Sequence, residues 1–155
     1  MQKIKIVCVG NIKEKYFTDA INEYKKRLQK FCDFEIVEVP EFLPLSKSND
    51  KQIKDKEASN IIKALGGFVV ALDLRGKDVS SEKLAEIIKE RTMFSDSKIT
   101  FVIGGSVGLG DEVIKRADKI ICIGQMTFPH QLVRVMLTEQ IYRAETIINN
   151  VKYHK

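Results

Sequence analysis

Along this chain, short runs of apolar residues typical of strands alternate with apolar residues spaced as on one face of a helix. Short apolar runs predict β-strands at residues 4–9, 34–39, 68–74, 99–103 and 120–123. Apolar residues at helical spacing predict helices at 15–32, 50–65, 81–94, 111–117 and 130–149. Strands that alternate with helices are typical of an α/β fold, so we expect a parallel sheet of five or six strands flanked by helices on both faces.

The predicted helix 130–149 carries more apolar residues than one contact face needs. Its stripe runs from Leu132 to Ile148 and is too wide for a helix that packs on a sheet alone. Either the helix is buried deep in its own core, or it packs on its own sheet and on a second subunit. We favour a homodimer through this helix, because a C-terminal helix in a small domain rarely has protein on both sides.

Composition narrows the class of protein. The chain has 155 residues and 44% hydrophobic content, which suits one domain over 1–155. No apolar run is long enough to span a membrane and the N-terminus enters a strand directly, so we expect a soluble, cytoplasmic protein. Cys8, Cys32 and Cys122 are far apart, which argues against a disulfide framework and against a metal site. A formal net charge of +5 permits a polyanionic partner without requiring one.

Two unusual loops follow strands that we expect to end at the same edge of the sheet. The segment IGGSVGLG, at 103–110, is so rich in glycine that it indicates a tight turn or the close approach of another chain segment or a ligand. The segment GQMTFP, at 124–129, is half apolar, which a plain connection does not require. Exposed backbone groups beside Met126 and Phe128 suit a flat heteroaromatic ligand better than a phosphate. The sequence therefore predicts a ligand site at this edge.

Common motifs exclude some classes of site and leave one alternative open. The first strand-to-helix turn has Gly10 as its only glycine, so the dinucleotide-binding fingerprint is absent. A GxxxxGK[ST] phosphate loop is absent as well. Ser106 lies in a GxSxG pattern, which would allow a small serine hydrolase. Its remaining triad members would have to come from His130, His154, Asp111 and Asp118.

Further candidate residues lie near the C-terminus. His130 begins the last helix, where the helix dipole disfavours its protonation, so we expect a mainly structural residue. Arg134 lies one turn later on the same face. Arg143 and the terminal YHK are either ordinary surface or a substrate contact. The tail 150–155 is polar, and disorder is expected unless something holds it.

The chain resembles the RlmH family, small SPOUT-class methyltransferases of the bacterial ribosome, over essentially its whole length. The resemblance rests on VGNIKEKY at 9–16, ALDLRGK at 71–77, FVIGGSVGLG at 101–110, MTFPHQLVRVMLTEQIYRA at 126–144 and the terminal YHK. It implies a SPOUT fold whose region 100–149 is threaded into a deep trefoil knot, which hydrophobic periodicity does not reveal.

The resemblance also implies a cofactor and an activity. The cofactor is S-adenosylmethionine, with no metal, and the implied activity is methylation of N3 of a pseudouridine in helix 69 of 23S rRNA on the assembled ribosome. The cofactor-binding residues implied by motif position are Leu72, Gly104, Ile123, Gly124, Gln125, Met126, Thr127 and Phe128. The catalytic candidates are His154, Tyr153 and Arg134, and the substrate-binding candidates are Arg143 and Lys155. A non-catalytic ribosomal-RNA-binding module and a SPOUT methyltransferase with another RNA target remain as alternatives.

Overall fold

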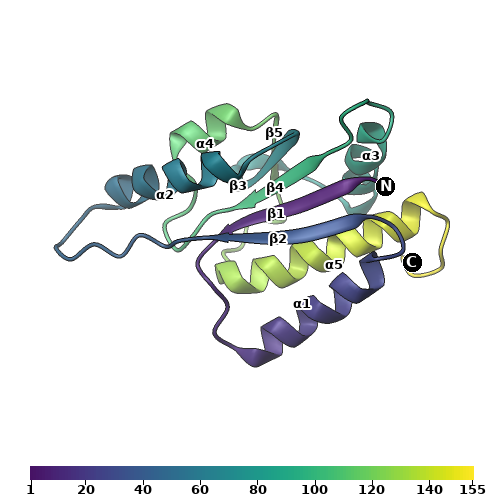
Figure 1. Cartoon of the computed structure of the whole chain (residues 1–155), viewed down its shortest axis with the longest axis horizontal. Helices are drawn as coiled ribbons and strands as arrows, with labels where there is room; N and C mark the ends of the chain where they lie inside the picture. Colours follow the sequence, from purple (N-terminus) through teal and green to yellow (C-terminus); the bar gives the residue numbers. More distant parts are fainter.

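One parallel sheet organises the molecule. The computed structural model describes residues 1–155, and its five strands are ordered β2-β1-β4-β3-β5 (Figure 1). Every neighbouring pair is parallel, which confirms the predicted α/β fold. The strands are β1 (Lys3–Val9), β2 (Asp33–Val39), β3 (Phe68–Asp78), β4 (Ile99–Ile103) and β5 (Lys119–Cys122). The helices are α1 (Lys15–Leu28), α2 (Asp50–Ala64), α3 (Ser81–Arg91), α4 (Asp111–Arg116) and α5 (His130–Ile148).

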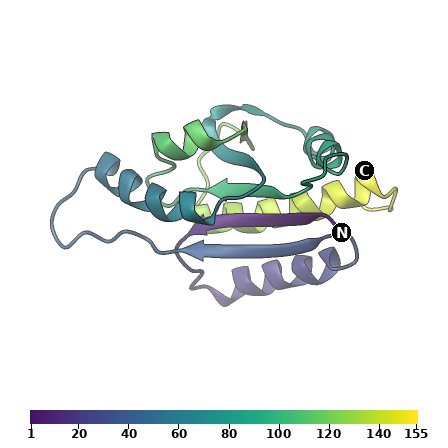
Figure 2. The same ribbon diagram turned by 45° about the horizontal axis from the view of Figure 1, so that its top comes forward.

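The helices cover both faces of the sheet. Helices α1, α3 and α5 lie on one face, where α5 contacts both of the others, and α2 and α4 lie on the opposite face (Figures 1 and 2). Alternate residues of β1 point to opposite layers. Ile4 and Ile6 belong to the core under α5, whereas Val7 and Val9 belong to the core under α2. Strand β4 is buried at every position, as expected of a central parallel strand.

Strand β3 is longer than the apolar run that predicts it. The pattern predicts a strand over 68–74, whereas β3 continues to Asp78. Leu74, Arg75 and Lys77 are exposed, so no hydrophobic pattern marks the extension. It is held instead by backbone pairing with β5, whose register shifts between Leu72 and Lys77.

Helix α5 buries most of its wide apolar stripe within its own chain. Leu137, Ile141 and Ala144 are buried in the core that includes residues of α3 and the sheet. Leu132 and Val135, in the first half of the helix, stay partly exposed. Two helices of the same chain thus account for much of the stripe, and its first half leaves an apolar surface open.

None of the helices combines the length and apolarity needed to cross a membrane.

Candidate functional site

A cavity of about 550 Å³ lies at the ends of β4 and β5, beside the middle of β3. Its walls come from three segments that are far apart in the sequence: the middle of β3, the glycine loop 104–110 and the loop 123–128. The start of α5 closes one side through His130 and Val133. Both loops singled out in the sequence therefore meet at one site. Its size and mixture of backbone and apolar groups suit a small organic ligand.

The glycine loop folds back on itself beside this cavity. Gly105 and Gly108 form an isolated antiparallel bridge, and the Gly108 N–H donates to the Gly105 carbonyl at 3.1 Å. A Cβ at Gly104 would lie 2.6 Å from the carbonyl carbon of Gly108, closer than atoms pack, and Gly108 has a φ of +81°. The loop therefore requires glycine at both positions, and it brings backbone N–H and C=O groups to the cavity wall.

Most residues expected to bind the cofactor line this cavity, and one does not. The lining residues from that set are Leu72, Gly104, Ile123, Gly124, Met126, Thr127 and Phe128. Gln125 points elsewhere, because its side-chain amide donates to the Asp78 carboxylate at 3.3 Å.

Charged residues at the mouth of the cavity were not singled out from the sequence. Lys54 of α2 and the pair Asp73 and Arg75 of β3 all line it. Burial alone would raise the pKa of Asp73, but hydrogen bonds from the side chain and backbone N–H of Arg75 hold that pKa below its ordinary value. The charged residues of the LDLRGK segment, where the apolar run of β3 gives way to polar residues, could have indicated Asp73 and Arg75. Nothing local indicates Lys54, which reaches the site only because α2 packs beside the glycine loop.

Arg134 lies in the interior and does not line the cavity. Its side chain is 2% exposed and its guanidinium donates to Glu38 at 2.8 Å. It also donates to the carbonyl oxygens of Gly10 at 3.1 Å and Val9 at 3.4 Å. These partners stand at the ends of β1 and β2, so Arg134 fastens the first turns of α5 to the sheet. In this chain it is not placed to hold a phosphate or a carbonyl of a substrate.

The C-terminal tail is ordered against α5 and α3. The Tyr153 hydroxyl donates to Glu139 at 3.0 Å, and its ring packs edge-on against Tyr142 with centroids 4.7 Å apart. Burial, followed by the bond to Glu139, raises the pKa of the Tyr153 hydroxyl. His154 contacts Arg143 and the side chain of Glu82. These contacts hold a segment that was expected to be disordered in isolation.

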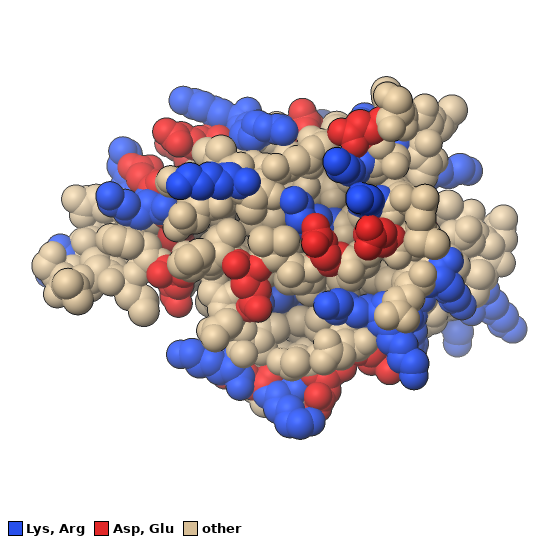
Figure 3. Space-filling model, in the orientation of Figure 1, with Lys and Arg blue, Asp and Glu red and all other residues tan.

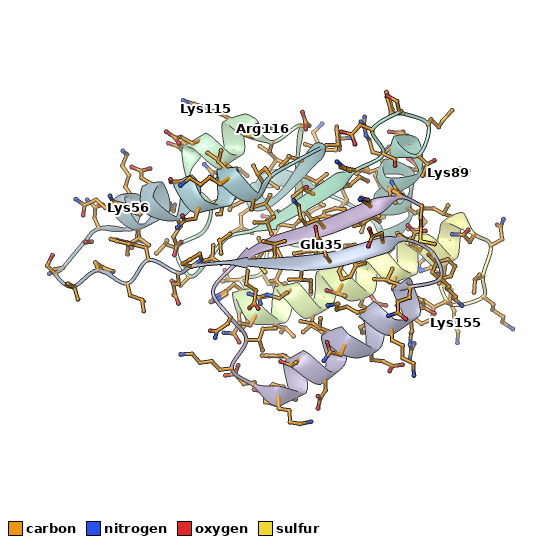
Figure 4. The ribbon with its side chains drawn as sticks, in the orientation of Figure 1. Glu35, Lys56, Lys89, Lys115, Arg116 and Lys155 are labelled. Carbon is orange, nitrogen blue, oxygen red and sulfur yellow. The ribbon has the colours of Figure 1, made fainter.

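The cavity and the tail lie at different ends of α5. His130 lines the cavity, and Arg143 lies about 20 Å further along the helix axis at 1.5 Å per residue. Lys155 lies near the end of α5 that is remote from the loops of the cavity (Figure 4). The fold therefore brings the expected cofactor residues together, and it brings Arg143, Tyr153 and His154 together, but it separates the two groups within one chain.

No serine hydrolase triad is formed. Ser106 and His130 both line the cavity, and no hydrogen bond joins them. Asp111 pairs with Arg75, and Asp118 accepts from the Val69 N–H and from Arg116. Neither acid orients a histidine, so the GxSxG pattern serves the turn rather than a nucleophile. Across residues 1–155, no three His, Cys, Asp or Glu side chains are grouped to hold a metal ion.

Comparison with known proteins gives the family. A family model described as a predicted SPOUT methyltransferase matches residues 2–154. The chain belongs to the SPOUT methyltransferase family. It is 51% identical over 157 residues to the ribosomal RNA large subunit methyltransferase H of Limosilactobacillus reuteri, an alignment that covers 98% of this chain and 99% of that protein. The resemblance to the RlmH family is thereby confirmed.

Further comparisons agree with this SPOUT assignment. The ribosomal RNA large subunit methyltransferase H 1 of Clostridium perfringens is 48% identical, with coverage of 98% of this chain and 99% of that protein. A solved structure of a probable methyltransferase from Bordetella pertussis Tohama I superposes with a TM-score of 0.62 at 13% identity, covering 93% of this chain and 95% of that chain. This last likeness concerns the fold alone.

Proposed function

We propose that this SPOUT protein transfers a methyl group from S-adenosylmethionine to N3 of a pseudouridine in helix 69 of 23S rRNA, in the cytoplasm and on assembled ribosomes. The observation that carries the proposal is the cavity built by the glycine loop and the loop 123–128, in a chain about half identical to rRNA methyltransferases over its full length. The trefoil knot over 100–149 and the single domain 1–155 belong to the same proposal. No metal is required for it.

The chemistry of the cavity supports S-adenosylmethionine as the cofactor. Leu72, Ile123, Met126 and Phe128 supply apolar walls for a flat ring, and the backbone of 104–108 supplies hydrogen-bonding groups. The charged groups at the mouth suit the zwitterionic methionyl part of the molecule. When bound, S-adenosylmethionine supplies an electrophilic methyl group, so the protein has to orient the acceptor nitrogen and remove its proton.

The position of the tail supports a site shared between two subunits of a homodimer. Within one chain, Arg143, which contacts His154, lies about 15 Å along α5 from Val133, the last residue of that helix to line the cavity. An antiparallel partner α5 would bring the other tail to the cavity. The partly exposed residues Val135 and Met136 line a second cavity of about 400 Å³, which shares Ile123 with the first and reaches Glu139. An apolar surface at that place suits such a partner.

The charge of the molecule is consistent with an RNA substrate without defining how it binds. On the face seen in Figure 3, Lys and Arg side chains are interspersed with Asp and Glu, so the net charge of +5 forms no single broad basic patch there. Recognition of helix 69 therefore depends on a few individual basic side chains, and our candidates are Arg143 of α5 and Lys155 of the tail. Such binding to free RNA is weak and sensitive to salt.

Two measurements test the proposed function. Calorimetry should detect binding of S-adenosylmethionine to the purified chain, and absence of binding would favour the rival in which the protein is a non-catalytic rRNA-binding module. Mapping of methylated nucleotides in 23S rRNA, from a strain that lacks the gene and from the same strain with the gene restored, identifies the target. Restored methylation at a nucleotide outside helix 69 would favour a SPOUT enzyme with another RNA target.

A further inference from the structure

The imidazole of His154 is held on both of its nitrogens. Nδ1 lies 3.2 Å from Nη1 of Arg143, which belongs to α5. Nε2 lies 2.7 Å from Oε1 of Glu82, in the first turn of α3. The His154 side chain is 24% exposed, so the ring is accessible while it is held.

These two partners determine which nitrogen carries the proton. A guanidinium can only donate, so Nδ1 has to be the unprotonated, accepting nitrogen. A carboxylate can only accept, so Nε2 has to carry the hydrogen. The neutral Nε2–H tautomer satisfies both bonds, whereas an imidazolium would set its Nδ1–H against an Arg143 N–H. Hydrogen bonding from His154 lowers the pKa of Glu82, which keeps that carboxyl ionised at neutral pH.

The surrounding structure fixes the position of Glu82. The Ser80 side chain caps α3 by accepting from the Lys83 N–H at 3.1 Å. The Ser81 hydroxyl donates to Gln140 of α5 at 2.7 Å, which ties the start of α3 to the helix that carries Arg143. The charged or titratable groups around His154 are thus Glu82 from α3, Arg143 and Glu139 from α5, and Tyr153 from the tail.

We propose that Glu82 is a positioning residue for His154: it holds the ring as the Nε2–H tautomer and leaves Nδ1 as the atom that accepts the substrate proton. This proposal rests on the proposed function. When Arg143 turns from Nδ1 to a phosphate or carbonyl of the RNA, the Nδ1 lone pair becomes free.

The proton transfer then balances as follows. The N3–H bond of the pseudouridine breaks and an Nδ1–H bond forms, while the electron pair stays on N3. N3 bonds to the methyl carbon, and the pair of the broken carbon–sulfur bond stays on sulfur. Glu82 now faces an imidazolium and stabilises its charge, in the manner of a carboxylate behind a catalytic histidine. The imidazolium afterwards releases its proton to water.

Nuclear magnetic resonance tests the tautomer without any substrate. In the full-length chain labelled with ¹⁵N-histidine, the ring nitrogens of His154 are assigned by their loss in His154→Asn, which leaves only His130. We expect a protonated Nε2 and an unprotonated Nδ1 in the unsubstituted chain. In Glu82→Ala, where Arg143 still donates to Nδ1, the Nε2 resonance should shift and its hydrogen should exchange faster with water. A mixture of tautomers should appear only when Glu82→Ala is combined with Arg143→Ala. A protonated Nδ1 in the unsubstituted chain, or a spectrum unaffected by Glu82→Ala, would overturn the proposal.

Kinetics test whether this arrangement serves the reaction. We expect Glu82→Ala to lower kcat by about 10- to 100-fold, with little change in the KM for S-adenosylmethionine. Glu82→Gln keeps an accepting oxygen but loses the charge, so the acid limb of its rate–pH profile should move to lower pH, because the imidazolium is less stable. The matched control is Glu86→Gln, an exposed glutamate of the same helix that pairs only with Lys83.

The outcomes separate this proposal from the proposed function. A Glu82→Ala rate equal to that of Glu86→Gln would overturn the proposal even if the unsubstituted enzyme methylates rRNA. A chain that binds no S-adenosylmethionine and methylates no rRNA would instead refute the proposed function, whereas the tautomer measurement would still report on the contact between Glu82 and His154.

Discussion

Three charged side chains are buried in this protein, Glu57, Arg134 and Glu145, and the surroundings of the last two differ. Arg134 has a carboxylate and two backbone carbonyls as partners of its terminal nitrogens, and only its Nε lacks a partner. Glu145 of α5 is 4% exposed, its Oε2 accepts from the Asn149 amide at 3.3 Å, and its Oε1 has no hydrogen-bond partner. Burial raises the pKa of the Glu145 carboxyl to about 7. The interior therefore binds a proton at this residue more tightly than the unfolded chain does.

This proton makes stability depend on pH. The folded pKa of Glu145 is about 7 against 4.5 for the ordinary group, so its contribution is fully present below pH 4.5 and is lost as pH rises through 7. We expect Glu145→Gln to be more stable than the unsubstituted chain by about 2 to 3 kcal/mol at pH 8 and nearly equal to it at pH 4.5. Denaturant unfolding at both pH values measures the difference. An equal pH dependence in the variant would contradict the assignment.

The roles of residues whose partners are distant in the sequence could not be predicted from local sequence patterns. Arg134, one turn after His130 near a predicted site, is a catalytic candidate by sequence. Its carboxylate partner Glu38 is 96 positions away, and only the sheet brings the two together. The sequence did not indicate Lys54 for the same reason, because only tertiary packing places α2 against the glycine loop. Residues within the two loops were predictable because each loop is continuous in sequence.

Among the structural elements, the glycine loop between β4 and α4 gives the sharpest test of the site. A methyl group at Gly104 would meet the backbone of Gly108 and Leu109 at 2.6–2.9 Å, where no flexible side chain can yield. We expect Gly104→Ala to weaken binding of S-adenosylmethionine by at least about tenfold, since the loop has to move and the wall is displaced. Calorimetry measures the affinity, and thermal unfolding shows whether the fold is retained.

Gly66 provides the control for this substitution. It has no atom within 4 Å of an added Cβ and lies in the turn after α2, away from the cavity. Gly66→Ala should bind the cofactor as the unsubstituted chain does. Equal affinities of the Gly104→Ala and Gly66→Ala chains would show that the glycine loop does not shape the cofactor site.

The spacing of apolar residues predicted the strands and helices, but it did not predict where all of them end. All five strands and five helices were predicted because each carries apolar residues at strand or helix spacing, although β2 buries only Val39 and α4 only Val113. The end of β3 was missed because exposed residues pair there through backbone alone. α1 ends at Leu28, before the predicted residue 32, because its last apolar residues, including Cys32, are buried in the turn that follows.

For the whole molecule, the separation of cavity and tail predicts complementation between two defective chains. One chain carries Gly104→Ala in the cavity, and the other carries His154→Asn in the tail. If an active site combines one subunit's cavity with the other's tail, each mixed dimer contains one intact site. When the two chains are mixed in equal amounts and their subunits exchange, about half of the dimers are mixed, and each mixed dimer has one intact site of two. The mixture should therefore reach about a quarter of the normal rRNA methylation rate. A mixture no more active than its separate components would refute the shared site.

The order of the strands also bears on how the molecule assembles. Strand β4 pairs with β1 on one side and β3 on the other, so it joins two parts of the sheet that share no direct strand pairing. β1 and β2 can pair early, but the inner edges of β1 and β3 stay open until residues 99–103 have been synthesised. Pairing between such distant segments is slow, and open strand edges are where chains associate wrongly. The hydrophobic segment ITFVI of β4 thus decides when the nascent chain stops being prone to aggregation.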